Sequence, residues 1–147
     1  MSDLSKNQKA YFNYFIIETI EAGLELKGFE VKAIKSGRAN IGGSFATIKD
    51  GQLWLTNANI RPYQPKNTPV DYDSKRPRRL LIKRSEINSL IAKLNGERLT
   101  IVPLRLYNKG SLIKVELGLV RGKKKSDKRE TIKKRAIERE AGRTFKN

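Results

Sequence analysis

Short apolar runs broken by turn residues fill residues 11–60 and predict β-strands. Glycines punctuate these runs, and the pair Asp50-Gly51 separates the run Ser44–Ile48 from the run Leu53–Thr56. An Asp-Gly pair between two apolar runs is a strong signal for a β-hairpin. We therefore expect strands throughout this part of the chain, with a tight hairpin at Asp50-Gly51.

Residues 61–79 differ in character and predict a loop. They hold four of the five prolines and few large apolar side chains; the prolines are Pro62, Pro65, Pro69 and Pro77. Proline lacks the backbone N–H that regular structure needs, so a cluster of prolines favours an irregular connection.

The pattern changes to a helical period after residue 84. Apolar residues recur at Ile87, Leu90, Ile91 and Leu94, which predicts one amphipathic helix. Ser85 is a candidate N-cap and Gly96 a candidate C-terminal stop. Two strands are expected next, at Leu99–Tyr107 and Leu112–Val120, joined by a turn at residues 108–111.

The predicted elements favour a small closed barrel over a sandwich. We expect a mainly β fold with a few helices, in which four or five short strands form an oligonucleotide-binding-type barrel (OB-fold-like). The predicted domain covers residues 1–121, and residues 122–147 form a basic C-terminal tail.

The tail is too poor in apolar residues to pack as a domain. It carries eleven Lys or Arg against four Asp or Glu, with Ile132, Ile137 and Phe145 as its large apolar residues. Such a segment buries too little surface to offset its ordering entropy, so we expect disorder when free. A helix is expected on binding, with Asp127 and Glu130 near its start, Glu130 and Lys134 paired, and Gly142 at its end.

The charge balance points to a polyanionic partner. The chain has 32 Lys or Arg against 15 Asp or Glu, a formal net charge of +17. Nucleic acid is the natural counterpart. An anionic membrane surface would also match the charge, but no run approaches the about 20 apolar residues of a membrane span. Residues 1–8 contain no apolar run of the signal-peptide type, so we expect a cytoplasmic protein.

The absence of Cys and His from the sequence argues against catalysis. Thiolate chemistry and the usual neutral-pH base and metal ligand are missing, and the acidic residues are scattered. We expect no enzyme activity, no metal and no cofactor.

Two clusters of basic residues are candidate RNA contacts. One runs through the tail, from Gly122-Lys123-Lys124-Lys125 to Lys133-Lys134-Arg135, and its alternative role is a solubilising extension. The other, Lys75-Arg76-Pro77-Arg78-Arg79, could equally be a solvated edge loop. Base stacking is open to Tyr63 and Tyr72, whereas core packing is the favoured interpretation of Trp54.

Several ordered blocks of the sequence resemble the bacterial SsrA-binding protein family (small protein B, SmpB). The resemblance runs from about Asn7 to Arg135. The blocks are Ile20–Leu24, Gly28–Lys32, Gly37–Ile41, Arg76–Leu81, Pro103–Tyr107, Lys114–Leu117 and Arg121–Lys124 ahead of Asp127–Arg129.

The resemblance implies a barrel that binds the tRNA-like domain of transfer-messenger RNA and delivers it to stalled ribosomes for trans-translation. It implies that the tail enters the vacant messenger channel and decoding centre of the ribosome. The expected partners are then this RNA and the ribosome. We expect a monomer that does not associate with a membrane. The resemblance places Glu21 and Leu81 in the RNA-binding face, with Lys83 at a further contact position. The other RNA-binding residues that we expect are Lys32, Arg76, Arg78 and Arg79. The ribosome-engaging residues expected in the tail are Gly122, Lys123, Lys124, Asp127, Lys128 and Arg129.

Four positions depart from the family pattern, and two of them, Gly43 and Ser74, are turn residues of little consequence. The other two bear on function. Lys83 stands where the family usually has Asn or His, and Ser126 stands where it commonly has His or Tyr. The alternative to the family function is a structural ribosomal protein of barrel type with a basic extension. An RNA-processing enzyme on the same barrel would need a metal site or an acid–base pair, and the sequence offers neither.

Overall fold

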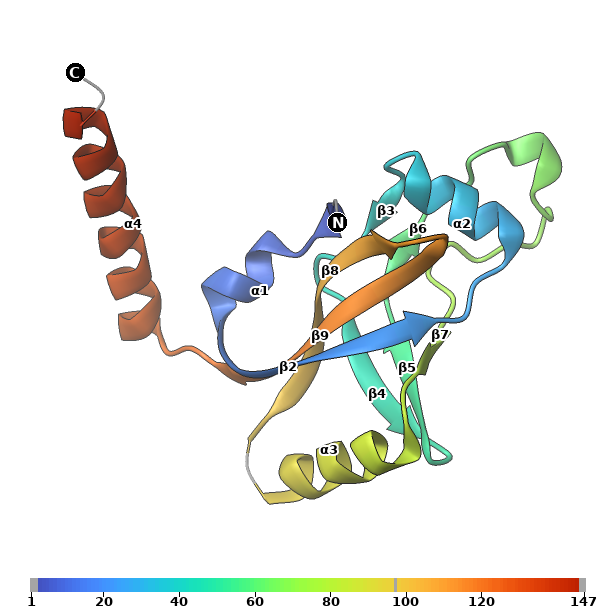
Figure 1. Ribbon diagram of the computed structural model, residues 1–147, viewed down its shortest axis with the longest axis horizontal. Coiled ribbons are helices and arrows are strands. Elements are labelled where there is room, and N and C mark those ends of the chain that lie inside the picture. The colour runs from blue at the N-terminus through green and yellow to red at the C-terminus, as the bar shows by residue number, and fades with distance from the viewer. Residues whose placement is uncertain (1–2, 97, 146–147) are drawn as a thin grey trace.

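The computed structural model describes residues 3–96 and 98–145, with side chains described through residue 139 (Figure 1). The elements in chain order are β1 (Asp3–Lys6), α1 (Gln8–Asn13), β2 (Tyr14–Leu24), α2 (Gly28–Lys35), β3 (Ala39–Asn40), β4 (Phe45–Lys49), β5 (Gln52–Thr56), β6 (Asn59–Ile60), the 3-10 helix η1 (Pro65–Asn67), β7 (Arg78–Leu81), α3 (Arg84–Gly96), β8 (Thr100–Lys109), β9 (Leu112–Gly122) and α4 (Lys125–Phe145).

The main sheet closes on itself. Its strands pair in the order β8-β4-β5-β7-β2-β9, and β9 pairs again with β8, while β1 adds to the outside of β8. All of these pairings are antiparallel. The mainly β fold expected from the sequence is confirmed, and the ring of pairings is that of a closed barrel.

Both predicted hairpins are confirmed. In the first, Lys49 pairs with Gln52 across a two-residue turn, and Asp50 and Gly51 adopt φ values of 53° and 71°. Positive φ at both turn residues matches the right-handed twist of the flanking strands, which explains the Asp-Gly pair. In the second hairpin, Lys109 pairs with Leu112 and Gly110 has a φ of 63°.

The barrel interior is filled by alternate residues of its strands. Leu53 and Leu55 of β5 and Val115 and Leu117 of β9 are completely buried, and the residues between them face outward or are only partly covered. Trp54 lies between Leu53 and Leu55 and is half-buried on the outer face. The interpretation of Trp54 as a core residue is therefore wrong, because the period of two places it opposite its buried neighbours.

Two helices lie where the sequence favoured strands alone. In α1, the Asn7 side chain accepts a hydrogen bond from the Ala10 N–H, and in α2 the Glu30 carboxylate accepts one from the Lys27 N–H at 2.9 Å. α2 buries Ala33 and Ile34 against the barrel. The strand interpretation of residues 11–60 is wrong for α2 and for the last three residues of α1, because short helices give too few turns for periodicity to decide.

The helix predicted after residue 84 is confirmed as α3. It buries Ile87 and Leu90 and ends at Gly96, and it lies across one end of the barrel (Figure 1). It begins at Arg84, so Ser85 is inside the helix and is not its N-cap.

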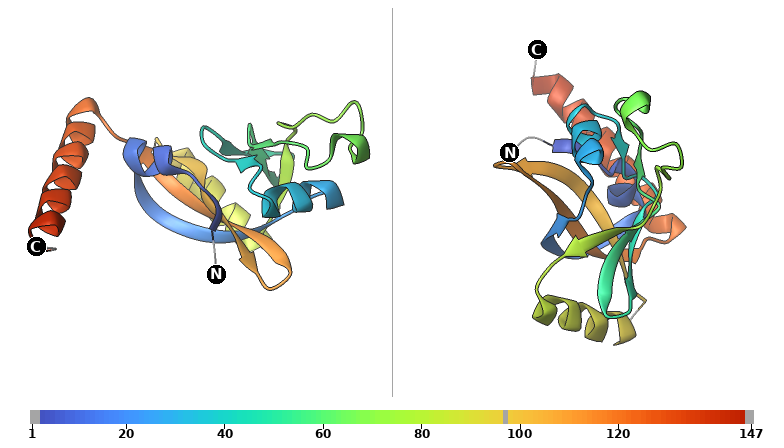
Figure 2. Two further views of the ribbon diagram at one scale, coloured as in Figure 1. Left: turned by 90° about the horizontal axis from the view of Figure 1, so that it is seen from above. Right: turned by 90° about the vertical axis from the view of Figure 1, so that its right-hand side faces the viewer.

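The tail forms α4, which projects from the barrel at the opposite end from η1 (Figure 2). The Asp127 carboxylate accepts a hydrogen bond from the Lys124 N–H at 3.1 Å, so Asp127 lies within the first turn. The helix continues past Gly142, which therefore does not end it. The structure describes the helical form of the tail, and the disordered free form stays a prediction. No helix among the described residues is long and apolar enough to cross a membrane.

Candidate nucleic-acid interface

Four of the seven predicted RNA-binding residues meet on one face of the barrel. Glu21, Arg79, Leu81 and Lys83 line an open hollow of about 400 Å³, together with Lys114. We call this the Glu21 hollow. Its residues come from β2, β7 and β9 and from the segment before α3. The barrel therefore brings together side chains that are far apart in the sequence, such as Glu21 and Lys114, which are separated by 93 positions.

The backbone of β2 allows a close approach of β7 in this hollow. Gly23 of β2 pairs with Leu81 of β7. A Cβ atom at Gly23 would lie 3.3 Å from the Leu81 Cβ, which is a tight contact. The absence of a side chain at Gly23 therefore gives Leu81 the position that it occupies beside Glu21.

The Glu21 carboxylate is oriented by two side chains of β8. The Tyr107 hydroxyl donates a hydrogen bond to one carboxylate oxygen, and the Lys109 ammonium lies 3.0 Å from the other. These bonds, that from Tyr107 above all, lower the pKa of the Glu21 carboxyl. Burial and the bond to Glu21 raise the pKa of Tyr107 to about 12. At neutral pH the carboxylate is ionised and fixed, with lone pairs left for an outside donor.

The rest of the Glu21 hollow combines an apolar surface with cations. The Leu81 side chain is 45% exposed, although it is a large apolar residue. Arg79 is exposed on β7, and Lys83 is exposed two residues after the end of this strand. The Arg79 guanidinium forms an ion pair with the Glu25 carboxylate at 4.0 Å. An exposed ion pair at this distance is weak, so Arg79 can exchange it for a phosphate.

Arg78 does not lie on this surface. Its side chain is completely buried and donates to the Glu30 carboxylate through Nε at 2.9 Å and a terminal nitrogen at 2.6 Å. A third bond joins it to the Ala58 carbonyl oxygen at 2.7 Å. The prediction of Arg78 as a direct RNA contact is therefore corrected: its charge is satisfied inside the protein.

Arg76 shares the same buried partner. Its guanidinium forms an ion pair with Glu30, and its side chain is only 26% exposed. The Tyr72 hydroxyl lies 3.0 Å from a Glu30 carboxylate oxygen and 2.9 Å from the Ile60 carbonyl oxygen, and these two acceptors share its single proton. Tyr72 is therefore a structural residue and is not open for base stacking.

Lys32 lies apart from the Glu21 hollow. It is exposed on α2 and lines a different hollow, of about 390 Å³, with Phe29, Tyr63 and Asn67. Tyr63 is exposed there and has the Arg38 guanidinium 5.8 Å from its ring centre. The seven predicted RNA-binding residues thus divide into one surface cluster, one internal ion-pair cluster and one separate cation.

The predicted tail residues begin where β9 ends. Gly122 is the last residue of β9, and the Lys123 N–H donates to the Asn13 carbonyl oxygen at 2.8 Å. The Lys123 ammonium lies 5.1 Å from the centre of the Phe15 ring, and Lys128 lies 6.0 Å from that of Phe12. Lys124 and Arg129 are exposed. The first turn of the tail is therefore attached to α1 and β2, and most of its cations face outward.

The sequence pattern did not predict Tyr107, Lys109 and Lys114 as parts of the interface. Tyr107 and Lys109 lie 86 and 88 positions from Glu21, so no local pattern connects them. The hairpin prediction did contain a usable signal, because β8 and β9 bring Tyr107 opposite Lys114. Among the described residues, no group of three or more acidic, His or Cys side chains could hold a metal ion.

Comparisons with known proteins assign the chain to one family. The model of the SmpB protein family matches residues 4–147. The SsrA-binding protein of Synechocystis sp. is 47% identical over 97% of this chain and 93% of its own length. The SsrA-binding protein of Mesoplasma florum is 50% identical over 97% of this chain and 96% of its own length. A chain of the solved structure "tmRNA-SmpB: a journey to the center of the bacterial ribosome" covers 86% of this chain, with 92% of its own length matched, 41% identity and a TM-score of 0.67.

Proposed function

Because this chain belongs to the SmpB protein family, we propose that it binds the tRNA-like domain of transfer-messenger RNA and delivers it to stalled ribosomes in trans-translation. The relatives over nearly the full length are named SsrA-binding proteins, and the similar solved structure joins SmpB with transfer-messenger RNA and the ribosome. A structural ribosomal protein is not favoured by these names.

The observation that carries the proposal is the gathering of Glu21, Leu81 and Lys83 in one hollow. Glu21 and Leu81 match the RNA-facing residues of the family, and Lys83 stands at the next such position, where the family usually has Asn or His. A carboxylate fixed among cations is repelled by phosphate and accepts hydrogen bonds from ribose hydroxyls or base amines. Leu81 supplies an apolar surface for a base or ribose, while Arg79, Lys83 and Lys114 neutralise phosphates.

The remaining predicted residues have more distant roles in this proposal. Lys32 meets RNA backbone outside the Glu21 hollow, and Arg76 contributes its partly exposed charge at the edge of the loop. Arg78 acts indirectly, by holding that loop against α2 through Glu30.

The two parts of the chain have separate tasks. Residues 1–121 hold the RNA, and residues 122–147 enter the vacant messenger channel and decoding centre. In the tail, Lys123, Lys124, Lys128 and Arg129 meet ribosomal RNA, with Gly122 as the flexible link and Asp127 capping the helix. A polycation of this kind gains affinity through counterion release when RNA surrounds it.

Catalysis has no part in the proposal. The protein contributes shape and charge as a monomer and needs no cofactor, and its site of action is the ribosome in the cytoplasm. Ser126 lies in the first turn of α4, where the family commonly has an aromatic side chain, so stacking at that point is replaced by charge contacts from Lys124 and Lys128.

Affinity measurements with the isolated tRNA-like domain test the RNA-binding part. We expect Leu81→Ala and Glu21→Ala to weaken binding by about tenfold each, as lost base or ribose contacts do, while circular dichroism shows an unchanged fold. Val70→Ala and Asp71→Ala, which alter exposed residues of the loop before β7, are the matched controls. Wild-type affinity in both hollow variants would overturn the assignment.

A further inference from the structure

A third hollow, of about 210 Å³, lies between α1 and the start of β4, and we call it the Phe45 hollow. Tyr14, which lines it, and Glu21 are seven residues apart on β2, roughly 20 Å along an extended strand. The Phe45 hollow is therefore distinct from the Glu21 hollow. It lies near the base of the tail, because the Lys123 N–H donates to Asn13, another lining residue.

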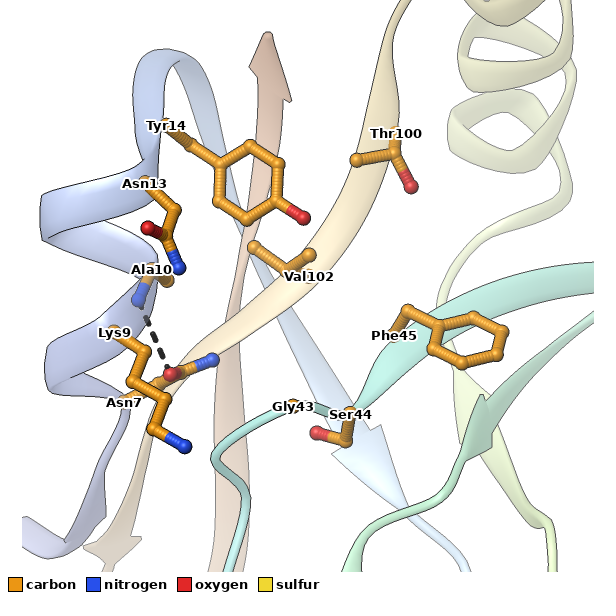
Figure 3. Close-up of a pocket in the computed structure, with 10 residues that line it drawn as sticks. All are labelled: Asn7, Lys9, Ala10, Asn13, Tyr14, Gly43, Ser44, Phe45, Thr100 and Val102. Carbon is orange, nitrogen blue, oxygen red and sulfur yellow. Dashed lines mark hydrogen bonds between the residues drawn. The ribbon is translucent and has the colours of Figure 1, made fainter. Parts of the chain in front are cut away.

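Two aromatic rings flank the opening of this hollow over an apolar floor. Figure 3 shows Tyr14, from the start of β2, and Phe45, from β4, on two sides of it, with Val102 of β8 between them. Val102 and Ala10 are buried, whereas Phe45 is 39% exposed. An exposed aromatic ring at the rim of an apolar depression is suited to stacking on a flat ligand.

The polar groups of the Phe45 hollow favour an anionic ligand. The Lys9 side chain is exposed at its rim, and Asn13 and Thr100 supply an amide and a hydroxyl (Figure 3). The ten residues that line it include no Asp or Glu. A cation, two donor–acceptor groups and two aromatic rings together match a nucleotide, whose base stacks while its phosphate meets the cation.

We propose that the Phe45 hollow binds one unpaired nucleobase of single-stranded RNA, by stacking against Phe45 and Tyr14. The proposal rests on the proposed function only in so far as RNA is the partner. It adds a base-stacking site on the tail side of the barrel, where RNA in contact with Lys123 and Lys124 passes α1. An apolar peptide side chain is the competing occupant, and the test below separates the two.

The test is a fluorescence titration of a short single-stranded RNA that contains one 2-aminopurine, with the full chain in about 150 mM salt. Stacking of the probe base quenches its emission, so we expect saturable quenching by the wild type. Phe45→Ala leaves the net charge unchanged and removes the ring, and we expect it to weaken the quenching interaction about tenfold. Phe45→Leu, which keeps apolar volume at the site, is expected to have a similar effect and covers the case in which the alanine variant does not fold.

Two control variants locate the effect. Val70→Ala shortens an exposed apolar side chain that lines neither the Phe45 hollow nor the Glu21 hollow. Leu81→Ala alters the Glu21 hollow. Both are expected to quench like the wild type, and Leu81→Ala alone is expected to lose affinity for the tRNA-like domain. Failure of the proposed function and failure of this inference are thus distinguishable.

Competition by small molecules identifies the group that is bound. Adenosine 5′-monophosphate is expected to reverse the quenching at concentrations where ribose 5-phosphate, which has the same phosphate and no base, does not. Absence of saturable quenching by the wild type, equal competition by both compounds, or wild-type quenching by both Phe45 variants would overturn the proposal.

Discussion

The guanidinium of Arg78 lies 2.6 Å from a carboxylate oxygen of Glu30, and both side chains are completely buried. Arg76 and the Tyr72 hydroxyl bind the same carboxylate. Glu30 belongs to α2 and its partners belong to the loop before β7 or to β7 itself. One buried carboxylate therefore fixes this loop, which ends at the strand that carries Arg79 and Leu81.

Removal of the buried cation is expected to destabilise the fold. Arg78→Met leaves the Glu30 charge partly uncompensated, and breaking a buried pair in this way costs about 3–5 kcal/mol of unfolding free energy. The adjacent variant Arg79→Met removes an exposed charge and is expected to change stability by less than about 0.5 kcal/mol while weakening RNA binding. Urea unfolding and filter binding measure both quantities. A stable Arg78→Met protein with lost RNA affinity would instead assign Arg78 to the interface.

Stability is also expected to depend on pH through Glu30. Burial alone raises the pKa of this carboxyl, but the hydrogen bonds from Arg76, the Lys27 N–H and Arg78 outweigh it, so the folded-state pKa is lowered. The stabilisation is therefore present above the unfolded-state pKa of about 4.3 and is lost as pH falls through the lower folded-state value. Urea midpoints between pH 7 and pH 3 test this. Glu30→Gln is expected to be less stable at pH 7 and to lose less on acidification; an identical pH slope in both proteins would contradict the assignment.

The orientation of Glu21 by Tyr107 predicts a selective effect on RNA binding. Tyr107→Phe removes the hydroxyl and keeps the ring, which is buried. Without this hydroxyl the Glu21 carboxylate loses one of the two groups that orient it, so we expect affinity for the tRNA-like domain to fall while the fold is retained. Tyr63→Phe is the matched control. In the double variant Tyr107→Phe with Glu21→Gln, the losses are expected to be less than additive, and full additivity would mean that Tyr107 acts independently of Glu21.

The predictability of these features from sequence depends on how local they are. The Asp50-Gly51 hairpin and α3 were predicted because turn chemistry and helical period lie within a few residues. The gathering of Glu21, Leu81 and Lys83 followed only from the family resemblance. The buried state of Arg78 could not be predicted, because its partner Glu30 lies 48 positions away and the surrounding run Lys75–Arg79 has the composition of an exposed loop.

RNA affinity is expected to fall steeply with salt. The net charge of +17 acts largely through counterion release. A protein that makes about 6 phosphate contacts loses on the order of a thousandfold in affinity between 50 and 200 mM salt on duplex-like RNA. Filter binding over this range gives the slope of log affinity against log salt concentration. The double variant Lys83→Met, Lys114→Met is expected to have a smaller slope, because it removes two phosphate contacts. A flat response would show that charge contributes little.

Peptide tagging on stalled ribosomes is expected to require the helical form of the tail in addition to its positive charge. Ile132 and Ile137 are exposed in α4, so their replacement by proline removes no core packing. Each proline inside a helix costs about 3 kcal/mol and leaves the net charge unchanged. We expect Ile132→Pro with Ile137→Pro to abolish peptide tagging on stalled ribosomes, with Ile132→Ala and Ile137→Ala as the control. Normal tagging by the proline variant would mean that the tail acts as an unstructured polycation.

The division of labour between barrel and tail is tested most directly by a chain that ends at Arg121. Residues 1–120 keep 20 Lys or Arg against 11 Asp or Glu, and the Glu21 hollow is intact in them. Binding to the isolated tRNA-like domain and peptide tagging on stalled ribosomes are measured side by side for this chain and the full-length protein. The account predicts that the shortened chain binds the RNA but supports no tagging. Tagging at the full-length rate would contradict it.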